Sequence, residues 1–402
     1  MNLPTKRRYP DMDKLSKVLS LNDFEALARL HLPKAIFGYI AGASEDSVSY
    51  AATLASFSRL SFVPRMLVDV SQRTSATRLF GQSYAAPFGI APMGICALSA
   101  YRGDIALARA AKAAGLPMIM SGSSLIRLEE VAEVNPDAWF QAYLPGEVEK
   151  IEALIERVNA THVRTLVITV DAAVSANREN NIRNGFSTPL RPSLRLAWDG
   201  LTHPWWFFGT FLRTLIAHGM PYFENNYAHR GAPVFSRSVM RDITHRSHLK
   251  WQHLRMIRSI WPGTLVIKGI LHPGDARKAV DAGADGIIVS NHGGRQLDGT
   301  VAPLLALPRV LEAVPHTPVM LDSGVRRGSD VLKAVALGAR FVFVGRPFGY
   351  AAAVGGEAGV RHGLKLLGEE VLRNMGMLGV TSISEVTREC LFEVECLCDH
   401  AS

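Results

Sequence analysis

Eight short apolar runs alternate with eight segments of helical period along most of this chain, and this alternation constrains the fold most strongly. The apolar runs span residues 87–91, 117–120, 138–143, 165–170, 265–268, 286–290, 318–321 and 341–345. The helical segments span residues 104–114, 128–134, 148–159, 249–260, 274–282, 303–313, 329–337 and 347–353. Such pairs are typical of parallel α/β structure, and eight of them predict a (β/α)8 TIM barrel. We therefore expect functional residues at the carboxyl ends of the strands.

Two stretches interrupt the alternation. Residues 13–58 have a helical pattern and predict a lead-in before the barrel. Residues 172–247 form a long insertion after the fourth strand, proline-rich at its start and aromatic in its middle. A length of 402 residues allows two ordinary domains or one barrel with additions, and the alternation favours the barrel. We predict one barrel domain over residues 13–384, a distinct inserted segment over residues 188–228 and a tail over residues 385–402.

Charge and cysteine content narrow the class of protein. The formal charge of +8 suits an anionic ligand, an anionic membrane surface or nucleic acid. The four cysteines are sparse, as in proteins of a reducing, intracellular compartment. No apolar run follows the basic residues Lys6, Arg7 and Arg8, so we expect neither a secretory signal nor an N-terminal anchor. The most apolar interval, residues 205–217, falls short of the roughly 20 residues that span a bilayer.

Polar and ionisable residues gather where the predicted strands end. Lys268 ends the fifth strand, where it either faces the pocket or extends to solvent. His292 and Arg295 follow the sixth strand in a glycine-containing loop. An imidazole can accept a proton near neutral pH, and a guanidinium can hold a carboxylate through two hydrogen bonds. Asp171, at the end of the fourth strand, is placed to orient the imidazole, so these residues predict a catalytic site for an anionic substrate.

The last two strand ends suggest a phosphate-binding site. Gly324 permits close approach of the backbone, and Gly345 and Arg346 add an amide and a guanidinium after the eighth strand. Barrels often bind phosphate groups at these two positions. The alternative is an ordinary tight turn after Asp322, with Arg326 at the surface.

A longer set of motifs points to one family. The run from Ser290 to Asp298, Ser-Asn-His-Gly-Gly-Arg-Gln-Leu-Asp, closely resembles the signature of the FMN-dependent 2-hydroxy acid oxidases and dehydrogenases. This family includes glycolate oxidase, L-lactate dehydrogenase and mandelate dehydrogenase. Further family motifs occur in order at residues 32–34, 39, 42–46, 62–65, 141–143, 169–171, 268–269, 322–328 and 345–346. The resemblance covers residues 13–384.

The resemblance implies an FMN cofactor and a role for each site residue. It implies that FMN is bound by Pro92, Met93, Gly94, Ser121, Gln141, Thr169, Lys268, Ser290, Asp322, Gly324, Arg326, Gly345 and Arg346. It implies that the substrate is bound by Tyr39, Tyr143, Arg178, His292 and Arg295, and that His292, Asp171, Tyr143 and Arg295 are catalytic. In this family the histidine takes the α-hydroxyl proton and the flavin takes two electrons, by a hydride or a carbanion route.

Three departures from the glycolate oxidase pattern place the chain nearer to the mandelate dehydrogenase branch. Ser123 stands where glycolate oxidases have a tryptophan, and Gly94 stands where oxidases commonly have an alanine. The loop of residues 172–178 also lacks the Pro-Arg pattern of glycolate oxidase. The small side chain at residue 123 leaves room for a larger, even an aromatic, hydroxy acid.

The insertion resembles the membrane-binding segment of the same branch, beginning at residues 199–204. Its apolar side chains are Trp205, Trp206, Phe207, Phe208, Phe211, Leu212, Leu215 and Ile216. Arg195, Arg213 and His218 add cationic or near-neutral polar positions. Aromatic and cationic side chains together are typical of a segment that lies on a membrane surface. An aromatic cluster that closes over the barrel, or a contact between subunits, is the alternative.

These observations predict an FMN-dependent (S)-2-hydroxy acid dehydrogenase that oxidises a mandelate-like or lactate-like acid and reduces a membrane quinone or similar acceptor. We expect a cytoplasmic protein, peripheral on the inner face of the cell membrane, and the resemblance makes a homotetramer plausible. One rival is a soluble oxidase that converts O2 to hydrogen peroxide, and another is a non-catalytic barrel that binds a phosphate ligand or a membrane. No motif indicates nucleic-acid binding. Cys396 and Cys398 with His400 are a weak signal without a second cysteine pair, so we expect no metal site.

Overall fold

The computed structural model describes residues 15–236 and 246–394. The basic residues 6–8 and the thiols and imidazole of residues 396–400, about which we made predictions, lie outside these ranges.

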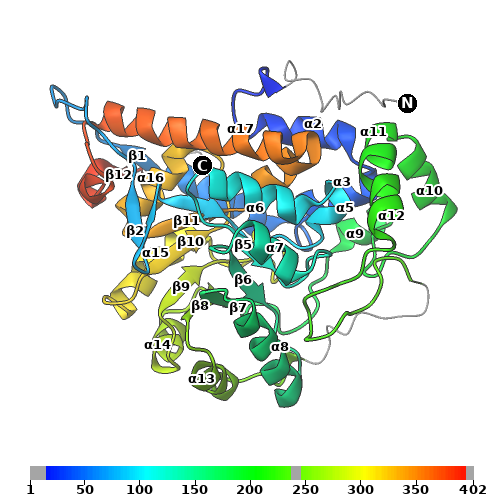
Figure 1. Ribbon diagram of the computed structural model, residues 1–402. Coiled ribbons are helices and arrows are strands. Elements are labelled where there is room, and N and C mark those ends of the chain that lie inside the picture. The colour runs from blue at the N-terminus through cyan, green and yellow to red at the C-terminus, as the bar shows by residue number, and fades with distance from the viewer. Residues whose placement is uncertain (1–14, 237–245, 395–402) are drawn as a thin grey trace, which may run out of the picture.

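The eight predicted strands form one parallel sheet that curls into a barrel (Figure 1). They are β4 (Phe88–Ile90), β5 (Ile119–Ser121), β6 (Trp139–Ala142), β7 (Thr165–Thr169), β8 (Thr264–Ile270), β9 (Gly286–Val289), β10 (Val319–Asp322) and β11 (Phe341–Val344). Parallel pairing runs from β5 through β11 and on to β4. A parallel bridge between Ile90 and Met118 brings the two ends of the sheet together. The predicted (β/α)8 barrel is confirmed.

Helices follow the strands and cover the barrel. They are α5 (Cys96–Ser99), α6 (Gly103–Ala113), α7 (Leu128–Val134), α8 (Val148–Ala160), α13 (Trp251–Ile260), α14 (Pro273–Asp281), α15 (Pro303–Ala313), α16 (Gly328–Ala336) and α17 (Arg346–Leu378). In α8 the buried residues are Ile151, Leu154, Ile155 and Val158. This spacing of three and four residues places them on one face, which packs inward.

The last helix is longer than predicted. We expected it to end at residue 353, yet α17 continues to Leu378, with one non-helical glycine at Gly356. Its second part buries Leu364, Leu367 and Val371, and the whole helix packs on α6 and on α2 (Asp23–His31) of the lead-in. The part of α17 beyond residue 353 therefore depends on contacts with residues that are distant in sequence.

The lead-in also contains α3 (Lys34–Ala41) and α4 (Val48–Ser56). After them, β1 (Leu60–Phe62) pairs antiparallel with β12 (Leu391–Glu393) near the end of the described chain.

Apolar side chains fill the barrel interior. They are Leu79, Ala91, Ile119, Trp139, Val167, Val266, Ile288, Met320, Phe341 and Phe343. A hairpin of β2 (Thr77–Leu79) and β3 (Gln82–Tyr84) places Phe80 beneath them, with its ring 5.8 Å from that of Trp139. The interior is therefore packed with apolar side chains and is covered at the end where the hairpin lies. The polar groups lie at the other end, where the strands have their carboxyl ends.

The insertion folds into short helices beside the barrel (Figure 1). They are α9 (Glu179–Asn184), α10 (Leu194–Leu201), α11 (Pro204–Trp206), the π-helical turn η2 (Phe207–Leu212) and α12 (Arg213–His218). Within residues 15–236 and 246–394, no helix is both long and apolar enough to cross a bilayer.

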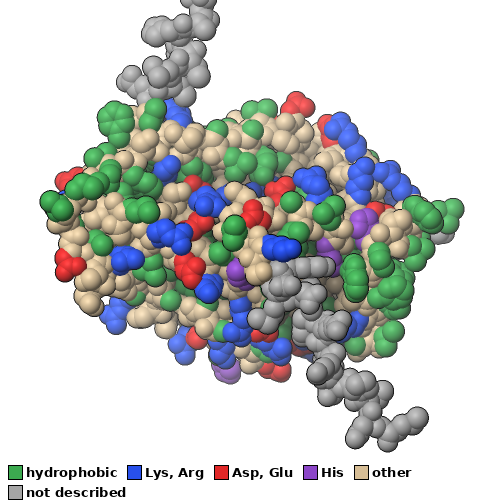
Figure 2. Space-filling model, turned by 90° about the horizontal axis from the view of Figure 1, so that it is seen from above, with side chains coloured by type: hydrophobic (Ala, Val, Ile, Leu, Met, Phe, Trp, Pro, Cys, Tyr) green, Lys and Arg blue, Asp and Glu red, His purple; other side chains and the backbone are tan. Residues whose placement is uncertain are grey.

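The insertion carries an apolar surface whose composition differs from our expectation. Trp206, expected at the surface, is only 5% exposed, and its Nε1 donates a hydrogen bond to the carbonyl oxygen of Leu98 at 2.8 Å. Helix α10 instead contributes exposed residues that we had not named. The resulting insertion patch consists of Leu194, Trp198, Leu201, Trp205, Phe208 and Ile216. Figure 2 shows hydrophobic side chains gathered at this end of the molecule.

Candidate active site

A cavity of about 470 Å³ opens at the carboxyl ends of the strands. Its walls contain most of the residues predicted for the site, namely Tyr39, Pro92, Met93, Gly94, Tyr143, Thr169, Arg178, Lys268, His292, Arg295, Asp322, Gly324, Arg326, Gly345 and Arg346. Ser121, Gln141, Asp171 and Ser290 lie directly behind this wall, each in contact with another residue of the predicted set. The fold therefore brings the predicted residues together around one space.

His292 is held between Asp171 and Tyr143. Its Nδ1 donates a hydrogen bond to Oδ1 of Asp171 at 2.7 Å, and the Oη of Tyr143 lies 3.2 Å from its Nε2. With the proton on Nδ1, the lone pair of Nε2 faces the cavity wall formed by Tyr143. This arrangement orients Nε2 to accept a proton.

Burial and charge set the protonation states of this pair. Burial lowers the pKa of His292, although Asp171 acts in the opposite direction, so the imidazole is neutral at neutral pH. Burial acts to raise the pKa of Asp171, but the interaction and hydrogen bond with His292 and the positive charges of Lys268 and Arg178 outweigh it and keep that pKa below its ordinary value. A neutral base therefore lies beside a carboxylate that can stabilise its protonated form.

Gly269 makes room for this carboxylate. Its φ of +105° is a backbone conformation that favours glycine, and a Cβ there would lie 2.7 Å from Cβ of Asp171. Any other residue would displace Asp171 or the backbone.

Lys268 is a buried cation that faces the site rather than solvent. Only 4% of it is exposed, and its Nζ forms an ion pair with Oδ2 of Asp322 at 2.9 Å and donates to Oγ of Ser290 at 2.8 Å. Burial acts to lower its pKa, but Asp322 and Asp171 outweigh this effect and raise it. Lys268 therefore stays charged, and the alternative of a rim lysine extending to solvent is wrong.

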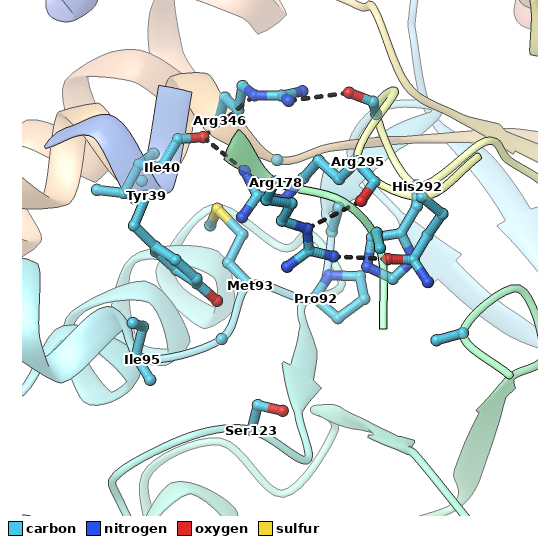
Figure 3. A pocket seen from close by; sticks show the side chains of 18 of the residues that line it. Tyr39, Ile40, Pro92, Met93, Ile95, Ser123, Arg178, His292, Arg295 and Arg346 are labelled. Carbon is cyan, nitrogen blue, oxygen red and sulfur yellow. Dashed lines mark hydrogen bonds between the residues drawn. The ribbon is translucent and has the colours of Figure 1, made fainter. Parts of the chain in front are cut away.

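Two guanidinium groups lie side by side between Tyr39 and His292 (Figure 3). The Nε of Arg178 donates to the carbonyl oxygen of Arg295 at 2.9 Å, and its Nη2 donates to Gln296 at 2.6 Å. The Nη1 of Arg295 donates to the carbonyl oxygen of Gly42 at 2.7 Å. Burial and the charge of Arg178 lower the pKa of Arg295 to about 9, which reflects a site that favours an anion.

A second cationic region lies at the ends of β10 and β11. Arg346 stacks its guanidinium over the ring of Tyr50 at 4.7 Å and donates to the carbonyl oxygen of Gly293 at 2.8 Å. Arg326 reaches the same tyrosine, with 3.4 Å between its Nη2 and Oη of Tyr50. Gly324 has a φ of +82°, so its backbone is in the left-handed region. Two cations beside a glycine turn suit a phosphate group.

Buried polar atoms without partners lie at the ends of β6 and β7. Nε2 of Gln141 and Oγ1 of Thr169 are buried and have no hydrogen-bond partner among the described residues. Unsatisfied buried donors and acceptors are costly, and these two atoms are available to bind a polar ligand. The heteroatom edge of an isoalloxazine ring, together with the phosphate region above, fits this arrangement of donors and cations.

Small residues keep the cavity open near Tyr39. A Cβ at residue 94 would lie 3.1 Å from Cβ of Ser123 and 3.2 Å from Oη of Tyr39, so Gly94 preserves this space. The ring of Tyr39 stacks on Phe186, with 4.5 Å between their centroids. This wall can accept a bulky, apolar substituent.

The sequence did not identify several residues of the site. Phe186 and Arg246 line the cavity from the insertion, and Tyr50 accompanies the phosphate region. Gln296 and Asp298 lay inside the signature, but we assigned them no role. Gln296 bridges Arg178 and the backbone of Asp171, and Asp298 accepts hydrogen bonds from the amides of residues 48 and 49 at the start of α4. For Gln296 and Asp298, only their place in the motif could have indicated a role in the site.

No group of three or more histidine, cysteine, aspartate or glutamate side chains suited to a metal ion occurs within the described ranges.

Known proteins resemble this chain over most of its length. Residues 28–393 match the family model of FMN-dependent dehydrogenase. The chain is 38% identical to L-lactate dehydrogenase of Pseudomonas entomophila over 374 residues, covering 92% of this chain and 97% of that protein. It is 34% identical to (S)-mandelate dehydrogenase of Pseudomonas putida over 375 residues, covering 93% and 94%. A crystal structure of the monotopic membrane protein (S)-mandelate dehydrogenase superimposes with a TM-score of 0.85 at 34% identity, covering 94% of this chain and all of that one.

Proposed function

The chain belongs to the FMN-dependent dehydrogenase family, and we propose that it oxidises an (S)-2-hydroxy acid with a mandelate-like or lactate-like side chain, with His292 as the base. It is an oxidoreductase of 2-hydroxy acids with FMN as its cofactor. The observation that carries the proposal is the neutral His292, whose Nδ1 is bound to Asp171 and whose Nε2 faces the cavity.

The residues of the cavity have different roles in the proposed reaction. Arg178 and Arg295 bind the substrate carboxylate, and Tyr39 and Tyr143 contact the carboxylate and the α-hydroxyl. Nε2 of His292 takes the hydroxyl proton, and Asp171 stabilises the imidazolium that forms. FMN, when bound, would supply the two-electron acceptor that the oxidation of the α-carbon to a ketone requires.

The remaining predicted residues hold FMN. Ser121, Gln141 and Thr169, with the backbone of residues 92–94, contact the isoalloxazine ring, and Lys268 provides a positive charge beside it. Asp322, Gly324, Arg326, Gly345 and Arg346 surround the phosphate, and Ser290 holds Lys268 in place. The unpartnered atoms of Gln141 and Thr169 support this assignment.

Anaerobic bleaching of the purified flavoprotein tests the proposal. We expect (S)-mandelate, (S)-lactate or a similar (S)-acid to bleach the flavin, and the (R)-enantiomers to be far slower. If none of a panel of 2-hydroxy acids, including glycolate and longer acids, reduced the flavin, a non-catalytic barrel would be the better description.

We further propose that the electrons pass to a membrane quinone or a similar acceptor rather than to O2. With a quinone analogue present in air, the peroxide formed should be a small fraction of the keto acid. Coupled assays of both products measure this ratio. Peroxide in amounts equal to the keto acid, unaffected by the acceptor, would instead establish the soluble oxidase.

We propose that the insertion patch binds the inner face of the cell membrane, as the relative described as a monotopic membrane protein suggests. Its tryptophans are well exposed, 70% for Trp198 and 79% for Trp205. Arg195 lies in α10 with Trp198, and Arg213 lies in α12 with Ile216 of the patch. Full burial of one such side chain contributes roughly 1.5–3 kcal/mol. A tetramer, the assembly that the family resemblance makes plausible, would present four patches.

Replacing Trp198 and Trp205 together by serine should therefore lower the partition coefficient onto anionic vesicles by at least about tenfold. Cosedimentation with the vesicles measures this coefficient. Phe392→Ser removes an exposed aromatic side chain on β12, outside the patch, and serves as the control. Equal binding by the double variant and the control would show that the patch is not the membrane contact.

A further inference from the structure

Phe186 is an aromatic residue of the cavity wall that comes from the insertion. It follows α9 directly, after Gly185, whose φ of +80° ends the helix. The amide of Phe186 donates a hydrogen bond to the carbonyl oxygen of Asn181 at 2.8 Å, so the chain turns back over the last turn of α9. Phe186 lines the cavity, yet only 4% of it is exposed. The end of the helix therefore holds this ring in the cavity wall.

The ring of Phe186 packs on the ring of Tyr39, which lies in α3. The two ring centroids are 4.5 Å apart and the ring planes differ by 26°, which is a stacked arrangement. The guanidinium carbon of Arg295 also lies over the ring of Tyr39, 5.0 Å from its centroid. The phenol of Tyr39 is directed into the cavity, where a Cβ at residue 94 would lie 3.2 Å from its Oη (Figure 3). The contacts over the ring therefore set the direction in which this hydroxyl group points.

Two hydrogen bonds attach the insertion to the same helix. Nδ2 of Asn180, in α9, donates to the carbonyl oxygen of Gly38 at 2.8 Å. Oδ2 of Asp199, in α10, accepts from the amide of Ala35 in the first turn of α3 at 3.1 Å. Because α9 and α10 are both bound to the helix that carries Tyr39, they fix the position of the insertion relative to this tyrosine.

We propose that Phe186 is a positioning residue for the oxidation, because its ring holds the phenol of Tyr39 where Oη meets the substrate. This inference rests on the proposed function, which gives Tyr39 its role in substrate binding. A displacement of about 1 Å at a group that positions the substrate can lower the rate by about 100-fold. The insertion therefore completes the substrate site, in addition to carrying the insertion patch.

The flat face of the ring is the property that the inference requires. Leucine at residue 186 keeps the wall apolar, but it offers no flat face on which a phenol can stack. In the complete flavoprotein, Phe186→Leu should therefore lower kcat/KM for the (S)-acid that bleaches the flavin fastest by at least about fivefold. FMN content should be unchanged, because the residues proposed to hold FMN are intact. Phe186→Met, which also lacks a flat face, serves if the leucine variant does not fold.

A double-mutant cycle with Tyr39→Phe separates positioning from other roles of the ring. Tyr39→Phe removes the hydroxyl group that Phe186 is proposed to position. In this background Phe186→Leu should therefore lower kcat/KM by less than about twofold. If the two single effects multiplied instead, Phe186 would act independently of the hydroxyl group, as a substrate contact or as part of the wall, and the inference would be overturned.

Phe235→Leu is the matched control. Phe235 lies in the insertion but outside the cavity wall, and its ring centroid is 5.6 Å from that of Phe211. The control should change kcat/KM by less than about twofold. A loss equal to that of Phe186→Leu would indicate a general loosening of the insertion and would also overturn the inference. If no 2-hydroxy acid bleached the flavin of the wild type, the proposed function would fail instead. The same cycle, measured on the Kd of phenylglyoxylate from the change in flavin absorbance, would then decide the role of Phe186.

Discussion

Replacing His292 by alanine is expected to lower the rate constant of flavin reduction by about 10³-fold to 10⁴-fold. His292 is the only histidine lining the cavity among the described residues, and its loss leaves the α-hydroxyl proton without an imidazole base. Anaerobic stopped-flow bleaching by a saturating 2-hydroxy acid measures the effect. FMN content should be unchanged, because Lys268 and the arginines of the phosphate region remain.

The pH profile distinguishes a base from a residue that only shapes the cavity. Because burial lowers the pKa of His292, the neutral imidazole persists below the ordinary histidine pKa. The wild-type kcat/KM should therefore be constant through the neutral range and fall only below about pH 6.5. This acid limb should be absent from the residual activity of His292→Ala, and added imidazole should restore part of the rate. Near-normal turnover by that variant would exclude His292 as the base.

The barrel and most of its site could be predicted because both follow from local patterns. Strands buried on two faces, such as residues 286–289, must be apolar along their length, so a charged residue such as Lys268 at such a position is conspicuous. The carboxyl ends of all the strands lie at one rim of the barrel. The fold class alone therefore predicts that residues as distant in sequence as Tyr143 and His292 lie close together.

Contacts that depend on tertiary packing could not be predicted. The carbonyl oxygens of Ile40 and Gly42, at the end of α3, accept hydrogen bonds from both Arg295 and Arg346, which links the substrate region to the phosphate region. Similarly, Trp206 is buried because its indole meets a carbonyl of α5. Hydropathy predicts the same exposure for Trp206 and for its exposed neighbour Trp205. Their difference in burial can be seen only in the folded chain.

Replacing Asp104 by asparagine is expected to stabilise the protein above neutral pH by roughly 4 kcal/mol. Asp104 lies in the first turn of α6 and is 1% exposed. Burial raises its pKa to about 7, although Ser124 and Arg102 act in the opposite direction. Ionising this carboxyl in the folded state is therefore costly, whereas in the unfolded chain it ionises near pH 4 at no such cost.

The sign of the effect follows from this raised pKa. The wild-type protein has its full stability from the protonated carboxyl below about pH 4 and loses it as the pH rises towards 7. The free energy of unfolding of Asp104→Asn should therefore exceed that of the wild type by an amount that grows by about 1 kcal/mol per pH unit between pH 5 and 7. Thermal unfolding at fixed FMN concentration measures this gain as a difference in Tm between the variant and the wild type that increases with pH. Asp281→Asn, at an exposed position of α14, should show no such trend. A variant that was less stable at every pH would mean that donors around Asp104 hold it as a carboxylate. Asp104 would then stabilise the start of α6 through its charge.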